Sequence, residues 1–203
     1  MSRSSCGTPS SLNLAAPLFP GAFSLIELLV VVAIFSIMVA LVIPAFTQVR
    51  AAGVLTRGGQ VLADQIALAR QEASTKNRDM EVRIVDVGGV YRAVQLWIRG
   101  EPATRPLGRI EQLPDGVVVS SDTLLSPLLG ASPIVGGTAV FGALGSCPYK
   151  GFRIRADGTL DAAVNLSNNF LTVQSANDVT VPPNNYFTVR VNPVTSQVTI
   201  HRP

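Results

Sequence analysis

One stretch of this chain is apolar without interruption, whereas later stretches mix apolar and polar residues at regular spacings. From Leu28 to Ile43 the most polar residue is Ser36, and several apolar residues before Leu28 lengthen the stretch. A helix of this length can cross a hydrocarbon core of about 30 Å. Because only a helix satisfies its own backbone hydrogen bonds in lipid, the pattern predicts one membrane-spanning helix over residues 23–46.

A second helix pattern follows over residues 47–78, where apolar residues recur at steps near three and four. Gly53, Gly58 and Gly59 each weaken a helix by up to about 1 kcal/mol relative to Ala, so we expect bending or melting there. The apolar stripe predicts that this helix lies against a sheet. Its members are Val54, Leu55, Leu62, Ile66, Ala69 and Ala73, opposite Gln60, Asp64, Gln71 and Arg78.

Alternating patterns and turn residues predict strands in the rest of the chain. A hairpin is expected around Gly88-Gly89, and residues 100–114 are expected to form a loop because they are rich in Pro and Gly. Residues 121–137 fit either a covered loop or one helical turn, and Cys147-Pro148 is expected to interrupt a strand. One helix followed by antiparallel strands gives an α+β fold. The predicted strands cover residues 80–86, 91–98, 117–120, 140–144, 152–155, 170–174, 186–191 and 197–201, with turns at 156–159 and 192–196.

Glu27 is the exception within the apolar stretch. A carboxylate there is unfavourable by a few kcal/mol in lipid unless it faces a partner. No Lys or Arg lies between Arg3 and Arg50, so its positive partner must come from outside the span. Glu27 follows Phe23 by four residues, one helical turn, so an amino group on Phe23 of a neighbouring copy could meet it.

The string FSLIELLVVV, which starts at Phe23, resembles the N-terminal signature of type IV pilins and pseudopilins. The resemblance implies cleavage by a prepilin peptidase before Phe23, N-methylation of Phe23, and assembly through Glu27. Pro44 lies where such proteins tend to carry a proline that loosens the helix. Ala22 stands where the family mostly has glycine, and Gly21 precedes it, so cleavage after Gly21 and after Ala22 both stay open.

The resemblance implies a pilin-like α+β fold, with a long N-terminal helix packed on an antiparallel head. The expected segments are a leader (1–22), a transmembrane and assembly helix (23–46), its amphipathic continuation (47–78) and a β-rich head (79–203). Residues 67–85 resemble the GspH/FimT group of minor pseudopilins, and the tail TVRVNPVTSQVTIHRP resembles the pilin-like Verru_Chthon cassette protein D.

The implied function is a structural subunit of a type IV pilus or type II secretion-like fibre. Its implied partners are the prepilin peptidase, other pilin or pseudopilin subunits and the inner membrane, which it would cross once with its head in the periplasm. Arg50 and Arg57 after the span oppose this orientation under the positive-inside rule, so the family resemblance sets it.

Two plainer interpretations of the apolar stretch are a secretory signal peptide and a simple anchor. A signal peptide has an apolar core of about 7–15 residues followed by a small-residue cleavage site. This core is longer, and only the weak sequence Val49-Arg50-Ala51 follows it. A simple anchor leaves Glu27 unexplained.

Composition argues against catalysis and against a strong polyanion-binding surface. Charged residues make up 14% of the chain and the net charge is +3. His201 is the only histidine and lies near the chain end, where an exposed strand end is the expected role. CxxC, HExxH and Gly-rich phosphate motifs are missing from the sequence, so we expect no enzyme activity, no catalytic residues and no cofactor. Cys147 would be the only cysteine left after removal of the leader with Cys6, and a buried thiol is expected.

Two sets of charged residues in the head, three aspartates and four arginines, are candidate ligand-binding residues. Asp157, Asp161 and Asp178 could be offered as calcium ligands, but Asp157-Gly158 is a common turn and no spaced acid motif surrounds it, so no metal site is expected. Some minor pilins of this kind bind DNA through C-terminal arginines, which gives an alternative function: a head that binds DNA or another partner. Asp157 and Asp161 partly cancel the candidate positive charges, and DNA binding is the less favoured interpretation. The candidates are Arg153, Arg155, Arg190 and Arg202.

Overall fold

The computed structural model describes residues 24–100, 104–161 and 168–202, and for residues 41–51 it describes the backbone alone. The chain divides into two compact units, Met1–Ala45 and Phe46–Pro203, and each is described here by itself. Helix α1 (Leu25–Lys76) supplies the described part of the first unit and begins the second.

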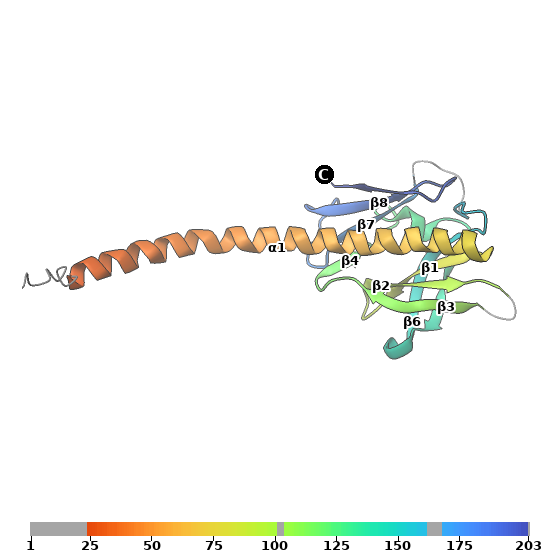
Figure 1. The fold of residues 1–203 in the computed structure, drawn as a ribbon, viewed down its shortest axis with the longest axis horizontal. Coiled ribbons are helices and arrows are strands. Elements are labelled where there is room, and N and C mark those ends of the chain that lie inside the picture. The colour runs from red at the N-terminus through yellow and green to blue at the C-terminus, as the bar shows by residue number, and fades with distance from the viewer. Residues whose placement is uncertain (1–23, 101–103, 162–167, 203) are drawn as a thin grey trace, which may run out of the picture. The chain divides into compact units, whose positions relative to one another are not determined.

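The second unit contains a nine-stranded antiparallel sheet among its described residues (Figure 1). The strand order is β5-β6-β1-β2-β4-β7-β8-β9, and β3 pairs with β2 outside this path. The strands are β1 (Met80–Asp86), β2 (Tyr91–Ile98), β3 (Arg105–Gln112), β4 (Val117–Val119), β5 (Val135–Val140), β6 (Ser146–Ile154), β7 (Phe170–Ser175), β8 (Tyr186–Val191) and β9 (Val198–His201).

The main core lies between the later part of α1 and one face of this sheet. The predicted helical stripe is buried there except for Val54, which is 37% exposed, because residues at steps of three, four and seven lie on one side of a helix. The expected α+β class, with a helix packed on an antiparallel sheet, is therefore confirmed. Helix residues Leu55, Leu62, Ile66, Ala69 and Ala73 share this core with sheet residues Val82, Leu96, Phe152, Leu171 and Val189.

The glycines of α1 allow the helix to approach the sheet closely. The prediction of local melting at these glycines is wrong, since α1 continues through all three. A Cβ on Gly59 would overlap the ring of Phe187, and one on Gly58 would lie 2.7 Å from Cγ1 of Val117. A Cβ on Gly53 would meet nothing within 4 Å. Two of the three glycines are thus explained by packing.

A smaller core covers the opposite face of the sheet. Val85, Ala93, Trp97 and Phe141 are buried together there. The rings of Trp97 and Phe141 meet edge to face with centroids 5.8 Å apart, and Phe141 meets Tyr149 at the same separation. Since both faces are covered, β1 is buried on both sides from Met80 to Val85, including the charged residues Glu81 and Arg83.

Several predicted turns and strands are confirmed. The hairpin of β1 and β2 closes where the Gly89 N–H donates to Oδ1 of Asp86 at 2.8 Å. The closing hairpin of β8 and β9 is also present, and its turn is stabilised by a hydrogen bond from Asn192 N–H to the Gln197 carbonyl. Between β4 and β5, residues Pro127–Gly130 form a 3-10 helix with Leu128 and Leu129 buried, which favours the helical-turn alternative.

Three predictions about the middle of the chain are wrong. Residues predicted as a loop over 100–114 include β3, whose side chains are mostly exposed, because backbone pairing with β2 creates the strand without an apolar pattern. The strand predicted over 140–144 lies earlier, as β5, and Gly142–Leu144 is a 3-10 helix. Strand β6 runs through Cys147-Pro148. Its pairing with β1 starts at Tyr149, so Pro148 lacks a neighbour on that side, where proline is tolerated.

Candidate functional site

The predicted assembly residue Glu27 lies in the first turn of α1. The N–H groups of Glu27 and Leu28 donate to the Ser24 carbonyl at 3.0 and 3.1 Å, which starts the helix. A carboxylate in the first turn is favoured by the partial positive charge of a helix N-terminus. The predicted processing residues Gly21, Ala22 and Phe23 lie outside the described residues, as does the side chain of Pro44.

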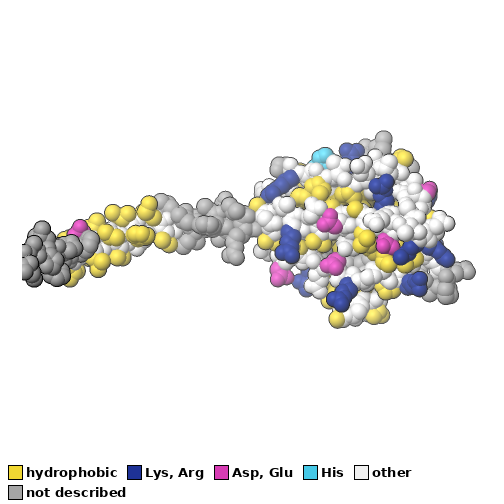
Figure 2. Space-filling view, in the orientation of Figure 1, with side chains coloured by type: hydrophobic (Ala, Val, Ile, Leu, Met, Phe, Trp, Pro, Cys, Tyr) yellow, Lys and Arg dark blue, Asp and Glu magenta, His cyan; other side chains and the backbone are white. Residues whose placement is uncertain are grey.

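The helix segment that follows Glu27 carries apolar side chains in all directions. The large apolar side chains from Leu25 to Val39 are 45–81% exposed, and Figure 2 shows hydrophobic side chains along this described segment. The hydroxyl of Ser36 donates to the Val32 carbonyl at 2.8 Å, so this polar group is satisfied within the helix. Within the described residues, no helix is both long enough and apolar enough to cross a membrane.

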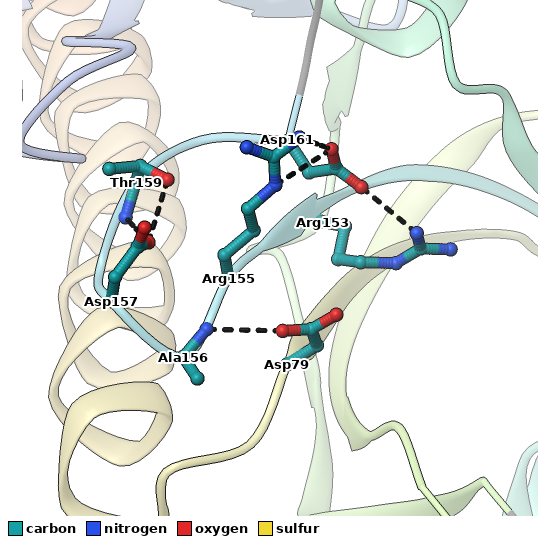
Figure 3. A network of polar contacts seen from close by, with 7 residues as sticks. All are labelled: Asp79, Arg153, Arg155, Ala156, Asp157, Thr159 and Asp161. Carbon is teal, nitrogen blue, oxygen red and sulfur yellow. Dashed lines mark hydrogen bonds and ion pairs between the residues drawn. The ribbon is translucent and has the colours of Figure 1, made fainter.

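Two of the predicted arginines, Arg153 and Arg155, meet at one acidic residue (Figure 3). Asp161 accepts hydrogen bonds from Nη1 of Arg153 at 2.9 Å and from Nε of Arg155 at 3.0 Å. Nη2 of Arg153 also lies 3.6 Å from a carboxylate oxygen of Glu81. Asp161 is thus shared by both arginines, and the Arg153 side chain is only 15% exposed, which leaves a polyanion little accessible positive charge at Arg153.

Arg190 and Arg202 belong to a second group, beside a cavity of about 710 Å³. Phe187 and Val189 of β8 face the main core, so Arg190 lies on the opposite face of that strand. His201 also lines the cavity and is exposed at the end of β9, as predicted. Nη1 of Arg202 donates to the hydroxyl of Thr56 at 2.9 Å.

The other two candidate calcium ligands, Asp157 and Asp178, stabilise turns. Asp157 accepts from the hydroxyl and the N–H of Thr159, and these bonds, led by the hydroxyl, lower the pKa of Asp157 (Figure 3). The pKa of Asp178 is lowered in the same way, first by the hydroxyl of Thr180 and then by its N–H. Among the described residues, no three His, Cys, Asp or Glu side chains are grouped so that they could hold a metal ion.

Arg83 is a buried cation that the sequence pattern did not predict. Its guanidinium carbon lies 4.0 Å from the ring centroid of Trp97 and 4.3 Å from that of Tyr149, and both rings attract a cation through their faces. Nε and Nη2 of Arg83 also donate to Oε2 of Glu81 at 3.0 and 2.6 Å. The sequence did contain a pattern that indicates this cluster. Glu81 and Arg83 are two residues apart on a predicted strand and so share a face, and Trp97 pairs with Glu81 across the hairpin.

Cys147 is half-buried rather than fully buried as predicted. Its thiol donates to the Leu144 carbonyl at 3.4 Å. It packs against the smaller core, at the edge of the cluster around Phe141.

No family model matches the chain, and no curated protein matches it. The chain is similar to two solved structures of the minor pseudopilin EpsH from the type II secretion system of Vibrio cholerae. One is 12% identical with a TM-score of 0.43, over 73% of this chain and 95% of that chain. The other is 14% identical with a TM-score of 0.46, over 74% and 94%.

Proposed function

We propose that this protein is a non-catalytic structural subunit, a minor pilin or pseudopilin, of a type IV pilus or type II secretion-like fibre. The observation that carries the proposal is the apolar surface of α1 from Leu25 to Val39, exposed all round, with Glu27 in its first turn. The residues around Glu27 are also those that resemble the pilin signature.

An exposed apolar surface of this extent needs a cover, because monomeric soluble proteins rarely leave such a large patch in water. Lipid would supply the cover before assembly, and equivalent helices of neighbouring subunits would supply it in the fibre. Burial of each large side chain contributes about 1.5–3 kcal/mol relative to water. The proposed location before assembly is the inner membrane, crossed once, with the head in the periplasm.

Glu27 would then select the register between neighbouring subunits. No described residue forms an ion pair with it. Cleavage by a prepilin peptidase after Gly21 or Ala22 would create a new amino group within about one helical turn of Glu27, and methylation would follow on that residue. The amine of one copy can pair with Glu27 of the next, where low dielectric strengthens the attraction.

The N-terminal residue of the mature protein tests the proposal. The protein is purified from its own membranes, and intact mass and terminal peptide sequencing identify its first residue. A methylated Phe23 or a methylated Ala22 supports the proposal and assigns the cleavage site. A chain that still begins with Met1 would overturn the processing route and remove the proposed partner of Glu27.

DNA capture by the head is the less favoured function. Arg153 and Arg155 share Asp161, and the Arg153 side chain is only 15% exposed, so the two arginines offer a phosphate backbone little accessible positive charge. Electrophoretic mobility of a DNA duplex with the full chain, at low and high salt, distinguishes the functions, since contacts to phosphates weaken steeply with salt.

A further inference from the structure

Strand β5 forms one border of the sheet in the second unit. It pairs with β6 on one side, with Val135 opposite Gly151 and Val140 opposite Ser146, and no described strand pairs with its other side. The part of β6 beside Val140 projects beyond β1, because β1 pairs with β6 only from Tyr149 onward. The outer side of β5 therefore presents backbone N–H and C=O groups over about 20 Å without a partner in the described sheet.

The edge of β5 carries none of the residues that usually protect an open edge. The sequence has no Asp, Glu, Lys or Arg between Asp122 and Lys150, so β5 and the segments on both sides of it are uncharged. The strand itself also contains no proline. Native sheets block unwanted pairing with charged side chains, proline or very short edge strands. A six-residue strand without these features can accept another strand.

The two other edge strands of the described sheet do have such protection. Strand β3 pairs with β2 alone, and it contains Arg105, Pro106 and Arg109. Strand β9 has only four residues, ends at His201 and is followed by Arg202. The open edge of β5 is therefore a local property of this strand, and the rest of the head does not share it.

One face of β5 is also open to the side chains of an incoming strand. Gly136, Thr138 and Val140 alternate along this face and are all exposed. Val140 is 67% exposed, and Ile134 immediately before the strand is 76% exposed. Gly136 has no side chain, so it leaves space for a large side chain of the incoming strand. Val140 offers that strand an apolar contact on the same face.

We propose that β5 is the docking site for an extended, uncharged segment of a partner protein, which adds a strand to the sheet and carries β-branched or aromatic side chains at alternate positions. Main-chain hydrogen bonds supply the affinity in this mode of recognition, and alternate side chains supply the specificity. Here those side chains lie beside Gly136 and Val140. The proposal concerns the head alone and does not depend on how α1 is covered.

The same features disfavour a lipid surface and a nucleic acid at β5. Open sheet edges do not occur in the hydrocarbon region of a membrane, because their N–H and C=O groups find no partner there. A nucleic acid requires positive charge beside its phosphates, and β5 has none. An uncharged strand satisfies the backbone groups of the edge and covers its exposed apolar side chains at the same time.

A random octapeptide library displayed on phage tests the proposal, after depletion on empty micelles and selection on the full chain in a non-ionic detergent. We expect enriched peptides that lack charged residues at their centre and have β-branched or aromatic residues at alternate positions. A synthetic peptide of the most enriched sequence should bind about tenfold more weakly to Thr138→Lys and to Val140→Lys, because lysine on an edge opposes strand addition. Thr199→Lys, at an exposed position of β9, is the matched control and should leave binding unchanged.

Amide hydrogen exchange distinguishes strand addition from a contact between side chains alone. The bound peptide should slow the exchange of alternate amides within β5, those whose N–H groups point away from β6. Circular dichroism shows whether each variant is folded, and Thr138→Val, which keeps the strand uncharged, should bind as wild type does. Absence of enrichment, enrichment of charged peptides, equal binding to wild type and both lysine variants, or unchanged exchange in β5 would overturn the proposal. Concentration-dependent dimerisation that Thr138→Lys abolishes, while no peptide is enriched, would overturn it in favour of a second copy of this chain.

Discussion

Arg83 is held between two aromatic rings and a carboxylate on the face of the sheet opposite α1. The Glu81 and Arg83 side chains are both more than nine-tenths buried. Burying a charge is strongly unfavourable unless it is paired, so each of these groups depends on the other. Such a pair contributes little net stability compared with an apolar replacement, but removal of one member leaves an uncompensated charge.

We therefore expect Glu81→Gln to lower the free energy of unfolding by about 3–5 kcal/mol. The measurement is urea unfolding of the full chain in detergent, followed by the fluorescence of Trp97, the only tryptophan in the chain and a direct neighbour of Arg83. The double variant Glu81→Leu with Arg83→Met should recover much of the loss, because no buried charge of the pair remains.

Glu72→Gln is the control for this prediction, since Glu72 pairs with Lys76 nearer the surface of α1. Exposed helix pairs of this spacing contribute about 0.3–0.5 kcal/mol. An effect of Glu81→Gln as small as that of Glu72→Gln would contradict the buried-pair interpretation.

For single residues, the sequence predicted those structural roles that depend only on residues nearby in the chain. The turn at Asp157 and the strand end at His201 depend on a few neighbouring residues, and both are found as expected. The pairing of Asp161 with Arg153 and Arg155 depends on how the chain returns after β6, and the cavity at Arg190 depends on three strands and a distant segment. Side-chain spacing alone does not contain that information.

Among the elements, α1 was predicted best and β3 worst, for a physical reason. The apolar stripe of α1 is a local pattern that repeats each turn, so it survives in the sequence whatever the helix packs on. Strand β3 exposes nearly every side chain, and Pro106 lies within it. Only its backbone pairing with β2 makes it a strand, and proline is tolerated there because β3 has a single neighbour.

The glycines of α1 give a prediction for the element. Gly59→Ala should lower the free energy of unfolding by about 1–3 kcal/mol, because its methyl group would overlap the ring of Phe187 in a packed interface. Gly53→Ala should instead raise the stability by up to about 1 kcal/mol, since alanine favours the helix and the added Cβ meets nothing within 4 Å.

Thermal unfolding of the two full-length variants under identical conditions measures this difference. The pair is well matched, because the substitution, the helix and the intrinsic propensity change are the same and only the packing differs. Equal shifts in Tm for both variants would mean that Phe187 moves aside without loss, and that helix propensity alone decides the outcome.

For the whole molecule, the contrast within α1 carries the functional argument. From Leu55 onward α1 buries one apolar stripe against the sheet, and Leu68 outside this stripe is 39% exposed, whereas from Leu25 to Val39 all its large apolar side chains are exposed. The same type of residue is thus covered within the head in one part of α1 and exposed in the other. The sequence predicted this division, because an all-round apolar run and a one-sided stripe have different periodicities.

Glu27→Ala tests how that exposed part is used. We expect the variant to remain in the membrane fraction, because removal of a charge makes an apolar helix more apolar. Incorporation into the fibre should fall by at least about a hundredfold, since the neighbouring amine would be left without its partner in a low-dielectric contact. Immunodetection of this subunit in membranes and in sheared fibres measures the two quantities separately. Asp64→Ala, which removes an exposed carboxylate from the later part of α1, is the control and should assemble normally. Normal fibre incorporation of Glu27→Ala would show that the apolar surface alone sets the contact between subunits.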